Sequence, residues 1–191
     1  IQNLDINKIE KIFLTASGGP FNNLPLNKFK NITISQALQH PNWKMGKKIS
    51  IDSATMINKI YEVIEAKNIF NCSYKKIEIL IHSNSYVHAI LKSDTGITKI
   101  IVHDTTMRVP IFNTLYSDDN KKLKSKKIDI DKLNNLDLKK INIKRYPMIR
   151  LLNLLPNKHS LFETVIVSAN DTLVQLFLEN KIKFTDIQKK L

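Results

Sequence analysis

Four polar side chains close together in the sequence have the types and spacing to bind a phosphate and a cation. Ser53, Asn58, Lys59 and Glu62 supply a hydroxyl, an amide, an ammonium and a carboxylate. On a helix, at about 100° per residue, the last three fall on one side. A phosphate could bind Ser53 and Asn58, with Lys59 beside it, and Glu62 would then lie one turn away for a divalent cation. The alternative is an ordinary solvated stripe, which spacing alone does not distinguish from a site.

A loop and a helix must position these side chains. Residues 40–48, HPNWKMGKK, predict a polar loop, because the residue before a proline is pushed out of the helical region. Residues 49–51 alternate like a short strand. Asp52 and Ser53 then offer an N-cap for a helix running from residue 54 to about residue 70. The free N–H groups and the dipole at that helix start would favour an anion beside Ser53.

The predicted helix has two faces. Its apolar face is suited to packing on a core, and the opposite face is polar. The apolar positions are Met56, Ile57, Ile60, Val63 and Ile64, and the polar ones are Thr55, Asn58, Lys59, Glu62 and Glu65.

The rest of the chain predicts a small sheet and further helices. Residues 11–15, 77–81 and 97–103 have the pattern of strands. Residues 16–21, ASGGPF, predict a sharp turn whose glycines allow close approach of the backbone. Helices are predicted at 35–39, 148–155 and 167–179, and the chain stops in a further helix after residue 184. The fold class is therefore α+β, a small mixed sheet flanked by helices, followed by an extended linker and a partial α-helical C-terminal domain.

Several motifs resemble one enzyme family. Residues 40–48 (HPNWKMGKK) and 51–59 (IDSATMINK) closely resemble the signature of 1-deoxy-D-xylulose 5-phosphate reductoisomerases. The similarity continues over essentially the whole chain. The further segments are SGGPF at 17–21, HSNSYVH at 82–88, TTMRVPI at 105–111 beside the family's PDMRTPI, RYP at 145–147, SAND at 168–171 beside NAANE, and FTDI at 184–187.

The resemblance implies a reaction. It implies an NADPH-dependent, divalent-metal-dependent isomerisation and reduction of 1-deoxy-D-xylulose 5-phosphate to 2-C-methyl-D-erythritol 4-phosphate, in isoprenoid precursor biosynthesis. The metal would be Mg²⁺, Mn²⁺ or Co²⁺ and would chelate substrate oxygens as a Lewis acid and a template. A hard cation of this kind prefers oxygen ligands.

The resemblance also implies roles for individual residues. Glu62 would be the metal ligand, and Lys59 would face the substrate oxygens. Loop 40–48 would be a lid with Trp43 over the substrate. The residues implied to hold the phosphate end are Ser17, His40, Ser53 and Asn58, those implied to be catalytic are His40, Lys59 and Glu62, and those implied to meet the cofactor are Met45, Gly46 and Met107.

Three segments are predicted along the chain. Residues 1–116 would form the catalytic, substrate- and metal-binding domain, 117–145 a Lys-, Asp- and Asn-rich linker arm, and 146–191 the start of a helical C-terminal domain. The family's NADPH-binding Rossmann domain and its Asp-Ser-Glu metal segment have no counterpart in these residues. We therefore expect an internal or C-terminal fragment that does not oxidise NADPH on its own.

Departures from the family pattern leave a second interpretation open. Ile60 stands where the family has Gly, Thr106 where it has Asp, and Ser83-Asn84 where it has Pro-Gln. A branched side chain at position 60 could crowd the neighbouring backbone. The alternative to an enzyme is therefore a non-catalytic remnant that keeps a role in the fold or in a dimer.

Bulk composition bounds the remaining possibilities. The net charge of +13 over 191 residues would suit a basic nucleic-acid-binding module. However, the lysines are spread among Asn and Ile, as AT-rich codons would give, so we expect no nucleic-acid partner. The single Cys72 fits a reducing compartment, and the sequence has neither a membrane-spanning run nor a signal peptide pattern. We expect a homodimer in a bacterial cytoplasm, with a plastid stroma as the alternative.

Overall fold

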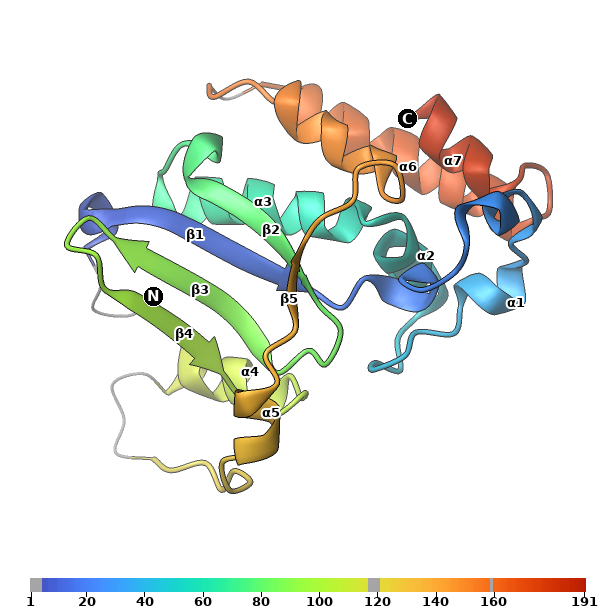
Figure 1. Ribbon diagram of the computed structural model, residues 1–191. Helices are drawn as coiled ribbons and strands as arrows, with labels where there is room; N and C mark the ends of the chain where they lie inside the picture. Colours follow the sequence, from blue (N-terminus) through green and yellow to red (C-terminus); the bar gives the residue numbers. More distant parts are fainter. Residues whose placement is uncertain (1–4, 117–120, 159) are drawn as a thin grey trace.

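The computed structural model describes residues 5–116, 121–158 and 160–191. Its centre is a five-stranded sheet with the order β4-β3-β1-β2-β5 (Figure 1). The strands are β1 Ile9–Ala16, β2 Ile77–His82, β3 Val87–Ser93, β4 Thr98–Val102 and β5 Leu138–Lys140. β1 and β2 are parallel and the other neighbouring pairs are antiparallel. The predicted small mixed sheet flanked by helices is thus confirmed.

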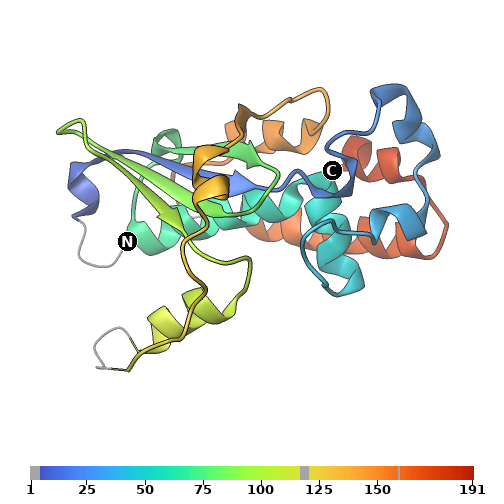
Figure 2. The same cartoon turned by 60° about the horizontal axis from the view of Figure 1, so that its bottom comes forward.

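Helices cover one face of the sheet and the end of the molecule where β1 ends. The helices are α1 Ile34–Ala37, α2 Lys47–Thr55, α3 Ile57–Phe70, α4 Arg108–Leu115, α5 Ile130–Asn134, α6 Phe162–Leu178 and α7 Phe184–Lys190. Shorter 3-10 segments are η1 Ile6–Lys8, η2 Gly19–Phe21, η3 Leu26–Asn31, η4 Tyr74–Lys76 and η5 Pro147–Asn153. Figures 1 and 2 show α3 lying along the sheet, and in Figure 1 α6 runs past α2 with α7 beside it. None of the described helices is long and apolar enough to cross a membrane.

The predicted short strand at 49–51 is wrong, and so is the predicted N-cap at Ser53. Residues 47–55 form α2, which begins after Gly46, and Ser53 lies in its last turn. The chain then breaks at Met56, with φ of 72° in the left-handed region, and α3 starts at Ile57. The sequence hides α2 because this helix buries Ser50, Asp52 and Thr55 together with apolar side chains. Its buried face therefore has no simple apolar period.

α3 confirms most of the predicted two-faced helix, including its end at Phe70. Its buried residues are Ile57, Ile60, Val63, Ala66 and Lys67, and Met56 before it is 3% exposed. Ile60 is fully buried in the core, so the branched side chain that departs from the family pattern is accommodated there. Thr55, predicted on the polar face, is also fully buried, because it belongs to α2 and precedes the break.

Other elements differ from the prediction. β3 and α4 were not predicted, and the expected helix at 148–155 is the 3-10 segment η5. The interval 117–145 contains α5 and β5, and β5 pairs with β2 through Leu80↔Lys140 to His82↔Leu138. Residues 117–120 of that interval lie outside the described residues. The predicted linker therefore contributes a sheet strand where it is described.

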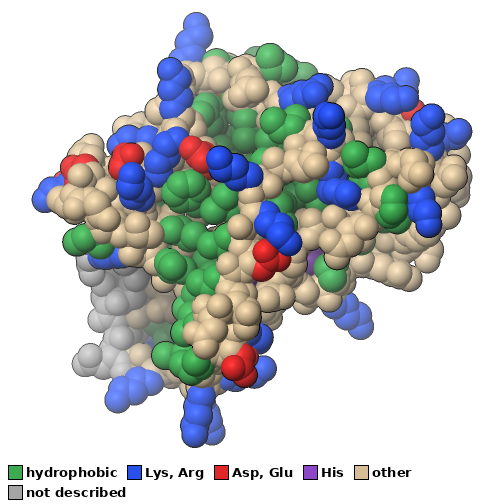
Figure 3. Space-filling view, in the orientation of Figure 1, with side chains coloured by type: hydrophobic (Ala, Val, Ile, Leu, Met, Phe, Trp, Pro, Cys, Tyr) green, Lys and Arg blue, Asp and Glu red, His purple; other side chains and the backbone are tan. Residues whose placement is uncertain are grey.

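One apolar core includes residues from both sides of the predicted domain boundaries. Phe21 packs edge-on against Phe184, with ring centroids 5.2 Å apart, and Phe29 and Phe177 also contact Phe184. Tyr146 is 1% exposed and belongs to the same cluster. Residues near the N-terminus and near the C-terminus are thus buried in the same core. The division into domains stays a prediction. On the face drawn in Figure 3, Lys and Arg side chains are spread rather than gathered in one patch.

Candidate functional site

Ser17 and His40, far apart in the sequence, are hydrogen-bonded through Ser17 Oγ and His40 Nε2 at 3.1 Å. His40 Nδ1 accepts the backbone N–H groups of Asn42 and Trp43, at 3.2 and 3.0 Å. Nε2 therefore carries the proton of the neutral ring and donates it to Ser17 Oγ. Burial lowers the pKa of His40, which favours this neutral form. Ser17 Oγ also accepts the N–H of Gly19 at 3.1 Å, so its own proton is available to a ligand.

The glycine turn after β1 packs directly on α2. A Cβ at Gly19 would lie 3.0 Å from the carbonyl oxygen of Ser53 and 3.2 Å from Cα of Ala54. Gly19 has φ of +62°, which favours glycine for a second reason. The close approach places the Ser17 turn beside Ser53, which is half-buried in the last turn of α2. Gly19 thus links the turn that carries Ser17 to the helix that carries Ser53.

The three polar side chains predicted to share a helix face do lie together. On α3, Asn58 Nδ2 donates to Glu62 Oε1 at 2.9 Å, and Lys59 Nζ contacts Glu62 Oε2 at 2.6 Å. The side chain of Lys59 is 14% exposed and that of Glu62 is 38% exposed. Glu65, one turn on, is exposed. Asn58 and Lys59 stand in the first turn of α3, where the helix dipole favours an anion.

The loop before α2 carries Trp43 and Met45, both half-buried, and ends at Gly46, the exposed N-cap of α2. Its first part is fixed, because Asn42 Nδ2 donates to the carbonyl of Ser83 and to Ser85 Oγ, each at 2.8 Å. Met107, the third residue predicted to meet the cofactor, lies in a different segment. It is the N-cap of α4 and is 56% exposed, so it is not packed in the core.

Asn42, Ser83 and Ser85 were not predicted as site residues. β1 and β2 are parallel, so Ser17 after β1 and the serines after β2 meet at one edge of the sheet. Ligands commonly bind at the carboxyl ends of parallel strands. Both strands were predicted from the sequence, but their parallel direction was not. A parallel pair would have indicated that hydroxyl side chains after both strands lie close together.

Two histidines next to this edge form a stack. The ring centroids of His88 and His103 are 3.5 Å apart, and the angle between the ring planes is 5°. His88 Nε2 donates to the carbonyl of His103 at 3.2 Å. Burial, and then repulsion from His103, lowers the pKa of His88 to about 4. The positive charge of Lys59 acts in the same direction. His88 is therefore neutral at pH 7.

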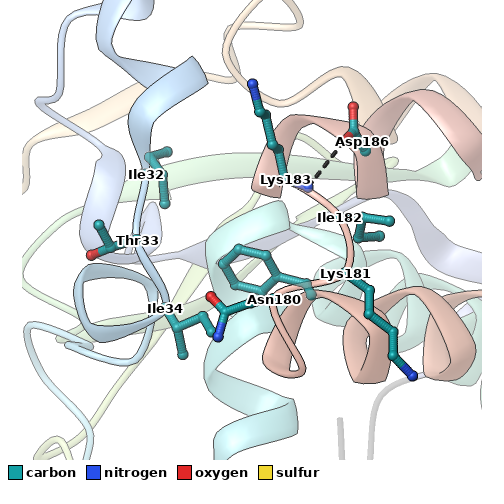
Figure 4. Close-up of a pocket in the computed structure, with 9 residues that line it drawn as sticks. Ile32, Thr33, Ile34, Asn180, Lys181, Ile182, Lys183 and Asp186 are labelled. Carbon is teal, nitrogen blue, oxygen red and sulfur yellow. Dashed lines mark hydrogen bonds between the residues drawn. The ribbon is translucent and has the colours of Figure 1, made fainter.

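Two pockets lie away from these polar residues. Figure 4 shows a pocket of about 460 Å³ between the segment 32–34 and the junction of α6 and α7, where the Lys183 N–H donates to Asp186. A second pocket, of about 590 Å³, lies between the edge of β2 and η5. No predicted site residue lines either one.

These residues offer only part of a metal-binding site. Glu62 offers the charged oxygen ligand that hard divalent cations prefer. Within residues 5–116, 121–158 and 160–191, however, no three His, Cys, Asp or Glu side chains gather to hold a metal. The donor set fits one metal ligand and does not fit a complete centre.

The α+β fold, a mixed sheet of five strands flanked by helices, is that of the C-terminal part of a reductoisomerase. A family model described as the 1-deoxy-D-xylulose 5-phosphate reductoisomerase C-terminal domain matches residues 1–70, and a second, the DXP reductoisomerase C-terminal domain, matches residues 103–191. The chain belongs to the 1-deoxy-D-xylulose 5-phosphate reductoisomerase family.

Curated relatives carry the same name. The reductoisomerase of Pelagibacter ubique is 64% identical over 185 residues, which are 97% of this chain and 48% of the relative. The apicoplastic protein of Plasmodium falciparum is 40% identical over 184 residues, or 95% of this chain and 37% of that protein. This chain spans about half, or less, of the length of the curated relatives it matches.

Solved structures share the fold. The Zymomonas mobilis reductoisomerase in complex with NADPH superposes with a TM-score of 0.88 and 33% identity, covering 99% of this chain and 48% of that one. A DOX-P reductoisomerase in complex with NADPH, fosmidomycin and magnesium gives a TM-score of 0.84 and 33% identity, covering 95% of this chain and 44% of that one.

Proposed function

We propose that this chain provides the substrate-holding part of an enzyme that isomerises and reduces 1-deoxy-D-xylulose 5-phosphate to 2-C-methyl-D-erythritol 4-phosphate with NADPH and a divalent metal. The observation that carries the proposal is the Asn58–Lys59–Glu62 cluster at the start of α3. It puts an amide, an ammonium and a carboxylate on one helix face, in a family that is named after this substrate.

The phosphate end of the substrate would be held by uncharged donors and a helix start. Ser17 has a free hydroxyl proton, because its oxygen accepts from both His40 and Gly19. Ser53 stands beside that turn, and Asn58 in the first turn of α3. A dianion would be stabilised by these donors and by the dipole of α3. Anchoring at this remote group lets binding energy orient the reacting carbons.

Lys59 and Glu62 would act at the other end of the substrate. Lys59, mostly buried, would exchange its contact with Glu62 for the substrate oxygens and stabilise developing negative charge. Glu62 would supply one metal ligand, and the others would come from outside the described residues. Mg²⁺ or Mn²⁺, when bound, would supply Lewis acidity, and NADPH would supply the hydride.

The loop with Trp43 would close over the bound substrate and exclude water. Met45 and Gly46 at its end, and Met107 at the start of α4, would meet the cofactor. Homodimer formation and a location in a bacterial cytoplasm or a plastid stroma stay predictions.

A chimera tests the proposed function. In it, this chain replaces the matching 185 residues of the Pelagibacter ubique relative, to which it is 64% identical. With 1-deoxy-D-xylulose 5-phosphate and Mg²⁺ we expect loss of NADPH absorbance. Glu62→Gln should raise the metal concentration for half-maximal activity about tenfold or more, since a contact to a charged group is worth about 1.5–3 kcal/mol.

Glu65→Gln is the matched control, because it removes the same charge one turn further along α3 from an exposed position. Both substitutions should preserve the helix, since the propensities of Glu and Gln are nearly equal. If the two variants show the same metal dependence, Glu62 belongs to a solvated stripe and the metal assignment is wrong.

A further inference from the structure

A buried ionic network joins α2 to α6. Asp52, with a side chain 3% exposed, accepts a hydrogen bond from Asn170 Nδ2 at 2.8 Å on one carboxylate oxygen. Lys48 contacts the other oxygen at 2.8 Å. Asn170 is fully buried in α6. A buried carboxylate needs such partners, because an unpaired charge or an unsatisfied acceptor inside the protein is costly.

Lys48 extends this network to the surface. Its Nζ also contacts Asp171 Oδ1 of α6 at 2.9 Å, and it lies 5.6 Å above the ring of Tyr61 in α3. Burial opposes the charge on Lys48, but the hydrogen bonds to Asp52 and Asp171 outweigh it and raise the pKa of Lys48 well above its usual range. Burial, reinforced by the charge of Asp52, raises the pKa of Tyr61 to about 12.

The network lies at the base of the Trp43 loop. α2 begins at Lys47, directly after Gly46, and Ser50 closes its first turn by donating both N–H and Oγ–H to the carbonyl of Gly46. The last turn of α2 packs on Gly19 through Ser53. One rigid helix therefore connects the loop, the serine turn and α6. Whatever holds α2 in place sets the position of both the loop end and Ser53.

We propose that Asp52, Lys48, Asn170 and Asp171 are positioning residues, which fix α2 to α6 and thereby set where the Trp43 loop ends and where Ser53 stands. They touch no reacting atom in this scheme. With one end of the loop fixed by Asn42 and the other by α2, substrate has only the intervening residues to order. Less ordering entropy is then lost on binding. The effect on substrate affinity rests on the proposed function, whereas the effect on the loop does not.

Hydrogen exchange and fluorescence of the 191-residue chain test the positioning directly. Trp43 is its only tryptophan, so its quenching by acrylamide reports on the loop. Asp171→Asn removes the partly exposed ion pair between Lys48 and Asp171. We expect about two- to fivefold faster exchange of amides 50–55 and easier quenching of Trp43. Asn170→Ala should increase exchange there about tenfold or more, because it removes a buried bond to a charged group.

Glu179→Gln is the matched control. Glu179 is paired with Lys181 at 2.7 Å at the end of α6, so the variant loses the same type of ion pair away from α2. Asp171→Glu keeps the carboxylate and should restore the wild-type values. Asp171→Asn and Glu179→Gln should unfold at similar urea concentrations, because exposed ion pairs contribute little to stability. If Asp171→Asn changes exchange and quenching no more than Glu179→Gln does, the proposal is wrong.

The chimera separates this inference from the proposed function. There, Asp171→Asn should raise KM about two- to fivefold with little change in kcat, since it affects ordering of the loop and no reacting group. A chimera without activity would contradict the proposed function, while exchange and quenching would still decide the positioning role. A fall in kcat at unchanged KM would contradict the positioning role.

Discussion

Hydrogen bonds determine which ring nitrogen carries the proton in His40 and in His88. The two backbone N–H groups on His40 Nδ1 fix its tautomer, so that Nε2 is the donor to Ser17. His88 is fixed similarly, because its Nε2 donates to the carbonyl of His103. The spacing of residues does not reveal the His40–Ser17 or the His88–His103 contact, since the two partners are 23 and 15 positions apart. The sequence indicated that His40 and Ser17 matter, but only through resemblance, and the structure supplies a physical reason.

Acid should destabilise the fold partly through His88. Its pKa is about 4 in the folded chain, against 6.5 when unfolded, because of burial, repulsion from His103 and the charges of Lys59 and His82. The unfolded state therefore binds more protons between these pH values, and stability falls as pH falls from about 6.5 towards 4. Urea unfolding at pH 7 and pH 5 measures the loss. In His88→Gln the difference between the two pH values should shrink, and an unchanged difference would show that His88 does not contribute.

Among the elements, the tandem α2–α3 departs most from expectation. Its residues were predicted to be polar at Thr55 and helical only from residue 54, but the break falls at Met56 and α2 precedes it. Buried Ser50 donates to the carbonyl of Gly46 one turn earlier, but buried Asp52 depends on Asn170, 118 positions away, which no local pattern indicates. The apolar face of α3 was predictable because it packs on the sheet with a regular helical period.

Gly19 is expected to be less replaceable than Gly96, because it combines a left-handed φ with a close contact to the backbone of α2. Gly19→Ala should destabilise by about 1–3 kcal/mol more than Gly96→Ala. Gly96 has φ of +85° with open space around it, so alanine there meets only the left-handed penalty of about 1–2 kcal/mol. Chemical denaturation of both variants measures the difference. Equal losses would show that the turn can move away from Ser53 at no cost.

At the scale of the whole molecule, local patterns predicted the sheet class but not how its parts join. The strands β1 and β2 and the helix α3 follow from periodicity. β5 was missed because a three-residue strand in a Lys-rich segment depends on its pairing with β2. The junction of the C-terminal segment was missed as well. Tyr146 donates to the Gly18 carbonyl at 2.8 Å, and Arg145 to the carbonyls of Phe21 and Leu24, each at 2.6 Å. These contacts pair residues more than a hundred positions apart, beyond the reach of any local pattern.

The shared core predicts a single cooperative unfolding transition. Phe184 is 1% exposed among Phe21, Phe29 and Phe177, so Phe184→Ala should lower the free energy of unfolding by about 3–5 kcal/mol. That loss should appear equally in hydrogen exchange of β1 amides and of α6 amides, because both open with the same core. If residues 1–116 and 146–191 were independent domains, β1 would keep its protection while α6 lost it. Leu161→Ala is the control, since Leu161 is 78% exposed and its loss should leave both sets of amides unchanged.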